Sequence, residues 1–300
     1  MLNQFEINAL IYEWNKEFSD LILNEEVFNH AFIASKTLNQ NASMVLKDNN
    51  QLIGLLLAKD NDPNLTQHIG YLSFIYVFKP FRNQGFGEKL VSHMFSRFKQ
   101  EGKKIVHVMG DMEPLFPGIY GKNDQRFFKR WFKETGNAYN LIRTQPFAKK
   151  DVVPFYFEHS TTNTLPLIEH FIETYFSKRW ALECKHYASS KHLFKKHHYI
   201  VLKDKDIIIG FIRANTLNAP LMHNTHYHEN YESLGGLGPL GIHPDYRKKG
   251  LAKALIHYAS NWLFEQGSSD VLVDWTGLKA FYENLGFSLE HHFRTYEKNL

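Results

Sequence analysis

Residues 238–259 read GPLGIHPDYRKKGLAKALIHYA, and this stretch decides the fold of the chain. An apolar run, Leu234–Ile242, passes through His243–Tyr246 into the basic segment Arg247–Lys249. A helix follows, and the members of its apolar face recur at helical spacing: Leu251, Leu255, Tyr258, Ala259 and Trp262. The stretch therefore predicts a strand, a basic turn that contains a glycine, and a helix.

The basic turn has the features of an anion site. The first backbone N–H groups of a helix have no acceptor inside the helix, and the helix dipole makes that end positive. Gly250 and the small Ala252 allow a ligand to approach the main chain, and the basic segment adds full positive charge. The turn therefore indicates phosphate binding, although a basic turn before a helix is often only a turn.

The composition limits the class of protein. A chain of 300 residues with 43% hydrophobic residues predicts a full core and two domains. A net charge of +4 argues against a protein built mainly to hold nucleic acid. The single cysteine, Cys184, excludes an internal disulfide framework, and no run of 18 apolar residues occurs. We expect a cytoplasmic protein with no membrane partner.

The first half of the chain contains helical and strand patterns in a regular order. Amphipathic helices are predicted at residues 5–18 and 24–38, and two apolar runs within Met44–Leu55 predict a β-hairpin. The elements that follow are a strand over Tyr71–Phe78, a glycine turn and helix, a strand over Lys104–Met109, and a basic aromatic helix near Gln125–Lys133. This order predicts a mixed α/β sheet with a parallel crossover.

The second half repeats this order. Val45–Asp48 with Gly54 reappears as Val201–Asp204 with Gly210 at an offset of 156 residues. The glycine turn matches at an offset of 165: Arg82, Gly85 and Gly87 correspond to Arg247, Gly250 and Ala252. A repeat of this length is too long for a solenoid. We therefore expect two tandem α/β domains, 1–146 and 147–300, each with a mixed central sheet flanked by helices.

Both halves resemble the GNAT superfamily of acyl-CoA-dependent N-acetyltransferases, whose signature is a strand, then Arg/Gln-x-x-Gly-x-Gly/Ala, then a helix. Here the signature stands as Arg82-Asn83-Gln84-Gly85-Phe86-Gly87 and as Arg247-Lys248-Lys249-Gly250-Leu251-Ala252. The second half adds IHPDY at 242–246 and FYENLGF at 281–287. The resemblance covers essentially the whole chain and is closest to bacterial tandem GNAT proteins.

The resemblance implies acetyl-CoA as the cofactor. In the family, the loop amides hold the pyrophosphate of CoA, and the preceding strand splays from its neighbour to pair with the pantetheine arm. In the second half these roles fall on Leu240, Ile242, Arg247, Lys248, Lys249, Gly250, Leu251, Ala252 and Lys253. In the first half they fall on Val77, Arg82, Asn83, Gln84, Gly85, Phe86 and Gly87.

Acetyl transfer to an amine also needs a stabilised oxyanion and an acid for the departing thiolate. Tyr282 stands where family members place this acid. An ordinary tyrosine pKa of about 10 keeps it protonated at neutral pH. Phe281 and Phe287 flank it, so it is equally a candidate core aromatic. The main-chain N–H of Ile242 is the expected oxyanion donor if the strand splays.

Asp274 is the candidate general base, because it follows the strand Val271–Val273 and is placed to face the acceptor. The alternative is a cap on the helix that follows, and this alternative is favoured because Asp and Thr at such a junction accept from free N–H groups. Glu232 and His243 are weaker candidates for the base.

Two clusters invite other functions. His223, His226 and His228 have spacings that suit zinc, but no fourth ligand is evident and we expect a loop without metal. The segment Arg126–Lys133 mixes basic and aromatic residues as nucleic-acid sites do, but its aromatic residues have the spacing of a core-facing helix. Neither cluster changes the interpretation.

The two halves are not equal. The first has Phe132 where the second has Tyr282, and it carries about 15 extra residues, including Phe116–Gly118, before this helix. Tyr120 in that insertion is the stand-in candidate for an acid. We therefore expect the second domain to be catalytic and the first to bind CoA or shape the acceptor site.

Three functions remain open at this point. The first is an acetyl-CoA-dependent N-acetyltransferase that acts on a primary amine of a small molecule or peptide. The second is a non-catalytic acyl-CoA-binding sensor or scaffold. The third is an aminoacyl-tRNA-dependent peptide transferase, whose members pair two similar domains but generally lack the Arg-x-x-Gly-x-Gly loop. Two tandem domains would act as a pseudo-dimer, so we expect a monomer.

Overall fold

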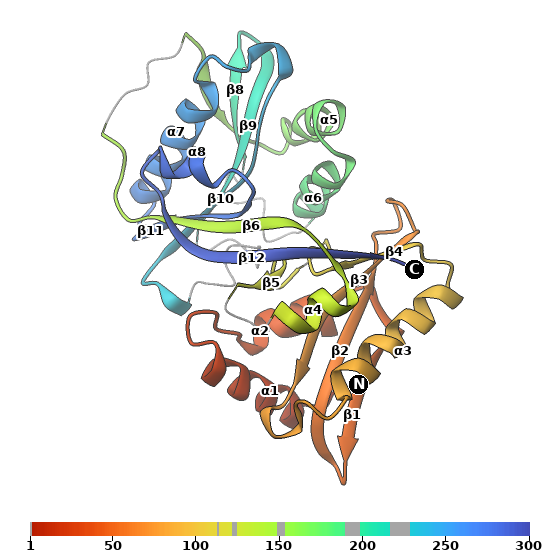
Figure 1. Ribbon diagram of the computed structural model, residues 1–300. Coiled ribbons are helices and arrows are strands. Elements are labelled where there is room, and N and C mark those ends of the chain that lie inside the picture. Colours follow the sequence, from red (N-terminus) through yellow and green to blue (C-terminus); the bar gives the residue numbers. More distant parts are fainter. Residues whose placement is uncertain (1, 113, 122–124, 149–153, 190–198, 217–228) are drawn as a thin grey trace. The chain divides into compact units, whose positions relative to one another are not determined.

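The computed structural model describes residues 2–112, 114–121, 125–148, 154–189, 199–216 and 229–300, with no side-chain description at 186–189. The chain divides into two compact units. Unit 1 comprises Met1–Ala138 and His291–Leu300, and unit 2 comprises Tyr139–Glu290. Figure 1 shows the helices and strands of both.

Unit 1 is built on a mixed sheet with the strand order β1-β2-β3-β4-β12. Its helices are α1 (Gln4–Glu17), α2 (Glu25–Phe28) with a π-helical turn at Asn29–Ile33, α3 (Phe86–Gln100) and α4 (Gln125–Trp131). Its strands are β1 (Leu38–Asp48), β2 (Gln51–Asp60), β3 (Ile69–Val77), β4 (Ile105–Val108), β5 (Ile119–Tyr120), the first part of β6 (Lys133–Arg143) and most of β12 (Ser288–Asn299). All neighbours are antiparallel except β3 and β4, which are parallel.

Unit 2 repeats this plan with the strand order β7-β8-β9-β10-β11-β6. Its helices are α5 (Leu165–Tyr175), α6 (Lys178–Ser189), α7 (Leu251–Glu265) and α8 (Lys279–Glu283). Its own strands are β7 (Tyr156–His159), β8 (Tyr199–Asp204), β9 (Ile207–Asn215), β10 (Leu234–Ile242) and β11 (Asp270–Thr276). The one parallel pair is β10 with β11.

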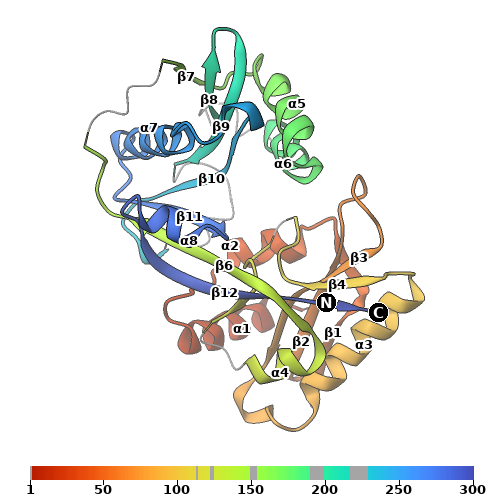
Figure 2. The same cartoon turned by 45° about the horizontal axis from the view of Figure 1, so that its top comes forward.

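Helices cover both faces of each sheet. In unit 1, rings of α1 and α2 pack on Phe74 of β3, with centroids 5.3 Å away for Trp14 and 5.9 Å away for Phe28. The helix α3 lies on the other face and places the ring of Phe98 against Gly70. Figures 1 and 2 show the same arrangement in unit 2, where β8–β10 lie between α7 and the pair α5 and α6. Apolar stripes on these helices and alternation along the strands create this layering.

The internal repeat that the sequence predicts is confirmed in the hairpins. Leu46 pairs with Gly54 and Asp48 with Gln51, with a register shift between Leu46 and Lys47. The same pairs recur in unit 2, where Leu202 faces Gly210 and Asp204 faces Ile207. The register shift again falls at the equivalent place, between Leu202 and Lys203. An irregularity in the same place in both copies shows that the mixed α/β fold occurs twice.

Two local predictions differ from the structure. The helix expected at 24–38 ends at Ile33, because Leu38 already belongs to strand β1 and pairs with Lys59. The strand β7 was not predicted, since four residues are too few for a recognisable alternation.

The last strand of each half completes the sheet of the other unit. Strand β6 passes from unit 1 into unit 2 at Ala138/Tyr139, and Tyr139–Arg143 pairs with β11. Strand β12 passes back at Glu290/His291, and Tyr296–Asn299 pairs with β4. The two units therefore do not coincide with the predicted ranges 1–146 and 147–300, which describe the repeated modules along the sequence.

Candidate active site

The parallel strands of each unit separate after four paired residues. In unit 1, Ile69–Leu72 pairs with β4, and in unit 2, Leu234–Leu237 pairs with β11. The register on the opposite neighbour shifts at the same point, at Ser73 in unit 1 and at Gly238-Pro239 in unit 2. Within the described residues, the rest of β3 and of β10 pairs only with the antiparallel neighbour. The splay on which the oxyanion prediction depends is therefore present in both units.

The amides beyond the splay face the opened side. His243 donates its N–H to the Ile209 carbonyl at 2.8 Å, so this amide points toward β9. Because successive residues of a strand point their N–H groups to opposite sides, the N–H groups of Ile242 and Leu240 point away from β9. The same reasoning places the N–H of Val77 on the opened side of unit 1, since Phe78 donates to the Ile53 carbonyl at 3.0 Å.

The glycine turns have the same backbone conformation in both units. Asn83 and Lys248 both have a φ of 61°, while Gly85 and Gly250 have φ values of 83° and 77°. The two glycines cap the helices α3 and α7 without any side-chain cap. The first intrahelical hydrogen bonds reach Lys89 and Ala254, so the amides before them have no acceptor inside the helix. Both turns thus present the backbone geometry of an anion site.

Gly250 is required by its backbone angle rather than by the space around it. A Cβ added there would meet nothing within 4 Å, but a φ of 77° favours glycine. Lys248, Lys249 and Lys253 are exposed around this turn, with the Lys249 Nζ 5.1 Å from the Tyr246 ring centre. Their charges surround the first turn of α7, whose amides have no acceptor inside the helix.

The arginine of each turn shapes the turn. Arg247 donates its Nε–H to the carbonyl of Ile242 at 3.0 Å, and Arg82 does the same to Val77 at 2.8 Å. These bonds tie the turn to the end of the splayed strand. In unit 1 the remaining guanidinium nitrogens of Arg82 donate to both carboxylate oxygens of Glu17, at 2.8 and 2.7 Å.

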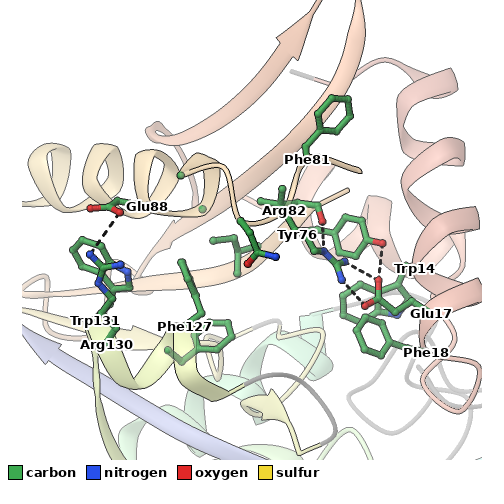
Figure 3. A pocket seen from close by; sticks show the side chains of 16 residues that line it. Trp14, Glu17, Phe18, Tyr76, Phe81, Arg82, Glu88, Phe127, Arg130 and Trp131 are labelled. Carbon is green, nitrogen blue, oxygen red and sulfur yellow. Dashed lines mark hydrogen bonds and ion pairs between the residues drawn. The ribbon is translucent and has the colours of Figure 1, made fainter. Parts of the chain in front are cut away.

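Glu17, Arg82 and Tyr76 form a network at the wall of a pocket in unit 1. The Tyr76 hydroxyl donates to Glu17 at 3.0 Å. Burial opposes the charge of Glu17, but the hydrogen bonds from Arg82 and Tyr76 outweigh it and lower the Glu17 pKa. The pocket has a volume of 590 Å³, and seven of its 16 lining residues are aromatic (Figure 3). Its walls include Trp14, Phe18, Tyr76, Phe81, Phe127 and Trp131, and the turn residues Arg82, Asn83, Gly85 and Gly87.

Asp274 lies inside strand β11, which continues to Thr276. The register with β6 shifts between Val273 and Thr276, and Trp275, with a φ of 46°, donates its N–H to Asn140 at 3.0 Å. The prediction that Asp274 caps the next helix is wrong. Among the described residues no side chain caps α8, and the Thr276 hydroxyl accepts from the N–H of Leu278, the residue before the helix, at 3.0 Å.

The Asp274 carboxyl is directed to the start of the splay. Its Oδ1 lies 3.4 Å from the position that a Cβ on Gly238 would take. Burial of the carboxyl raises its pKa to about 7. The charge of Arg213 opposes this rise and the charge of Glu183 adds to it. A carboxyl with this pKa exchanges protons near neutral pH.

Tyr282 belongs to the core of unit 2 and is electrostatically coupled to Asp274. Its ring packs against Phe281 and Phe287 with centroids 5.1 and 5.6 Å away, and its side chain is 7% exposed. Burial, and then the charge of Asp274, raises the Tyr282 pKa above its ordinary value. The ring of Tyr282 is therefore a core aromatic, and its hydroxyl stays protonated, as the proposed acid requires.

The chain matches the model of the acetyltransferase (GNAT) family over residues 6–114 and 165–287. It belongs to the GNAT acetyltransferase family. The two matched regions are the two repeated modules, so the protein is a tandem GNAT. A search of curated protein sequences found no match.

Solved GNAT structures share the fold. A GCN5-related glucosamine N-acetyltransferase region of a fungal multi-domain GH3 β-N-acetylglucosaminidase matches 99% of this chain with a TM-score of 0.86 at 17% identity. This chain spans 37% of that protein. A GCN5-related N-acetyltransferase from Sphaerobacter thermophilus matches 98% of this chain and 91% of its own, with a TM-score of 0.70 at 14% identity. A tandem GNAT protein of the clavulanic acid biosynthesis pathway matches 86% and 83%, with a TM-score of 0.58 at 12% identity.

The family membership supports an acyltransferase, and GNAT proteins generally use acetyl-CoA. In the part of the chain that the structure describes, no helix is both long and apolar enough to cross a membrane. Glu232 is exposed, and His243 packs its ring 4.3 Å from that of Tyr175. His223, His226 and His228 lie outside the described residues.

The structure adds pocket residues that the sequence did not indicate. Glu17, Trp14 and Phe127 line the unit 1 pocket but come from helices far from the loop in sequence. Tyr120, the stand-in acid, is buried, is not among the residues lining that pocket, and donates its hydroxyl to Asp20. The helical spacing of apolar residues in α1 and α4 predicts that each buries one face, but not that either helix reaches the loop.

Proposed function

We propose that unit 2 transfers an acetyl group from acetyl-CoA to a primary amine. One observation carries this proposal. The splay of β10 has the basic turn Arg247–Lys249 at one end and the Asp274 carboxyl at the other, with Tyr282 coupled to that carboxyl. A phosphate site, an oxyanion donor, a base and an acid therefore belong to one strand opening.

Each group has a defined task in this proposal. The free amides of α7 and the three lysines around them hold the CoA phosphates. The N–H of Ile242 donates to the thioester oxygen as charge develops on it. Asp274 removes a proton from the attacking amine, and Tyr282 protonates the departing thiolate. Release of free thiol on addition of an amine, measured over a library of amines, tests the activity directly.

The amino group of an amino sugar is the first acceptor to test. The fungal region with the TM-score of 0.86 is described as a glucosamine N-acetyltransferase. Glucosamine therefore heads the library. The other acceptors that the sequence leaves open, small amines and peptides, complete it. CoA binding without thiol release from any amine would favour the sensor function instead.

We predict that Lys248→Glu/Lys249→Glu weakens acetyl-CoA binding at unit 2 by about tenfold or more, which is about 1.4 kcal/mol or more. Reversing two charges beside a helix N-terminus puts carboxylates where the phosphates bind. Calorimetric titration measures the change. Lys99→Glu, an exposed reversal in the last turn of α3, is the matched control and leaves the affinity unchanged. Equal affinities in both variants would remove the phosphate site from this turn.

We predict that kcat/KM rises with pH up to about 7 and then levels, because the Asp274 pKa lies at about 7 and the base acts when deprotonated. The profile of Asp274→Asn lacks this inflection and lies far lower. A second readout does not need activity. Burial raises the Asp274 pKa on folding, so the carboxylate destabilises the native state increasingly as pH rises from about 4 to 7. Unfolding of Asp274→Asn does not show this loss.

A further inference from the structure

The phosphate turn of unit 1 differs from that of unit 2 in charge. At an offset of 165 residues, Asn83, Gln84 and Glu88 stand in place of Lys248, Lys249 and Lys253. The arginine of the turn, Arg82, is held by the Glu17 carboxylate. At these three positions unit 1 has two neutral side chains and one acidic side chain where unit 2 has three lysines.

An aromatic ring packs against the first turn of α3, directly after the glycine turn. A Cβ added at Gly87, the second residue of α3, would lie 3.0 Å from the ring of Phe127. Unit 2 has Ala252 at this position, so a Cβ is tolerated where no ring is present. The glycine in unit 1 thus makes room for the ring rather than for a ligand. A phenyl ring gives no hydrogen bond to a phosphate, and here it fills the space beside Gly87 in the first turn of α3.

Unit 2 has no side chain at the position of Phe127. The equivalence follows from matching hydrogen bonds, because Phe132 donates its N–H to Phe128 at 2.8 Å and Tyr282 donates to Leu278 at 3.3 Å. The same offset of 150 residues places Phe127 at Gly277. A Cβ at Gly277 would meet nothing within 4 Å. The phosphate turn of unit 2 therefore has no covering side chain from this position.

An ion pair also links α3 and α4 in unit 1. Glu88, in the first turn of α3, lies 3.7 Å from Arg130 of α4 (Figure 3). Both side chains are largely exposed, so the pair contributes little to stability. The Glu88 carboxylate nevertheless occupies the positive end of the helix dipole, where a phosphate would otherwise be stabilised.

We infer that Phe127 and Glu88 close the phosphate turn of unit 1 to CoA, so that the protein binds one CoA per chain, at unit 2. The inference rests on the proposed function only in assigning the one site to unit 2. Arg82–Gly87 then retains the GNAT signature without holding CoA phosphates. The turn residues then line a pocket of unit 1 whose two ion pairs, Glu17 with Arg82 and Glu88 with Arg130, carry no net charge.

Variants in which unit 1 carries the residues of unit 2 test the closure. The number of CoA molecules bound per chain is measured by calorimetric titration. The wild-type chain binds one CoA, and Lys248→Glu/Lys249→Glu weakens that site. The variant Glu88→Lys/Phe127→Gly binds two, and combining both changes leaves the new site in unit 1 as the tighter one. Phe127→Tyr keeps the ring and is the matched control, with one site per chain.

Two results would overturn the closure. The first is two CoA sites in the wild-type chain. The second is one site in the converted variant, provided that its melting temperature shows it folded; Glu88→Lys/Phe127→Ala repeats the test if the glycine variant does not fold. A wild-type chain that binds no CoA would instead overturn the proposed function, and a site gained on conversion would still support the closure.

Discussion

Tyr282→Phe lowers kcat by about a hundredfold or more and leaves CoA affinity and melting temperature nearly unchanged, because a general acid contributes on that order to the transition state. The ring keeps its contacts with Phe281 and Phe287. Only the hydroxyl that would protonate the thiolate is lost. Single-turnover kinetics with acetyl-CoA and the best acceptor of the amine library measure the effect.

The control for this variant is Tyr258→Phe. Tyr258 is also partly buried in unit 2, on α7, and burial raises its pKa as well, but its hydroxyl lies 3.3 Å from His159 rather than near the splay. Its loss leaves kcat unchanged. Since the Tyr282 pKa is raised, the hydroxyl stays protonated over the whole assay range and the pH profile belongs to Asp274. An unchanged kcat in Tyr282→Phe would make this tyrosine a core aromatic only.

Ending the chain after Glu290 unfolds unit 1 while unit 2 keeps its hydrogen-bonded sheet. The removed residues pair with β4 and β5 and bury two rings, Phe293 at 0% and Tyr296 at 2% exposure. Each large ring deleted from a core costs about 3–5 kcal/mol. Two such losses together with the strand approach the whole stability of a typical domain, about 5–15 kcal/mol.

Hydrogen exchange locates this loss. Amides of Leu55 and Leu56 in unit 1 lose protection, whereas those of Ile200 and Val201 in unit 2 keep it. The point variant Phe293→Ala lowers the free energy of unfolding by about 3–5 kcal/mol. Thr295→Ala, on the same strand, removes only an exposed hydroxyl contact with Thr135 and costs less than about 1 kcal/mol. Protection retained at Leu55 after truncation would mean that unit 1 folds without β12.

Local chemistry explains what could be predicted of the fold. The polar turn between the strands of the first hairpin contains Asn49 and Asn50, which adopt positive φ values of 45° and 66° as asparagine tolerates. The helix α7 follows from its apolar spacing, and the GNAT turn from its glycine and basic residues. Each of these signals lies within about 15 residues, the range over which periodicity specifies an element.

The rest depends on contacts between distant residues. Both β6 and β12 are ordinary strands at the end of a module, and either sheet satisfies their alternation, so no pattern shows which sheet each joins. Asp274 was named from its position, but its place inside β11, at the register shift before Thr276, depends on pairing with β6 and could not be predicted. Glu17 and Phe127 meet the loop of unit 1 only through packing, and no motif marks them.

The path of β12 sets an order for the completion of the two units during synthesis. Unit 1 begins at the N-terminus, but its sheet lacks β12 until residues after Glu290 leave the ribosome. At about 5–20 residues per second, translation of the roughly 150 residues after β6 takes on the order of ten to thirty seconds. The edge of β4 is exposed during that interval, and the unpaired N–H and C=O groups of a strand edge form hydrogen bonds with other chains, which leads to aggregation. Of the two units, the one whose synthesis starts first is therefore the later to complete its sheet, and its open strand edge gives chaperones a site to protect.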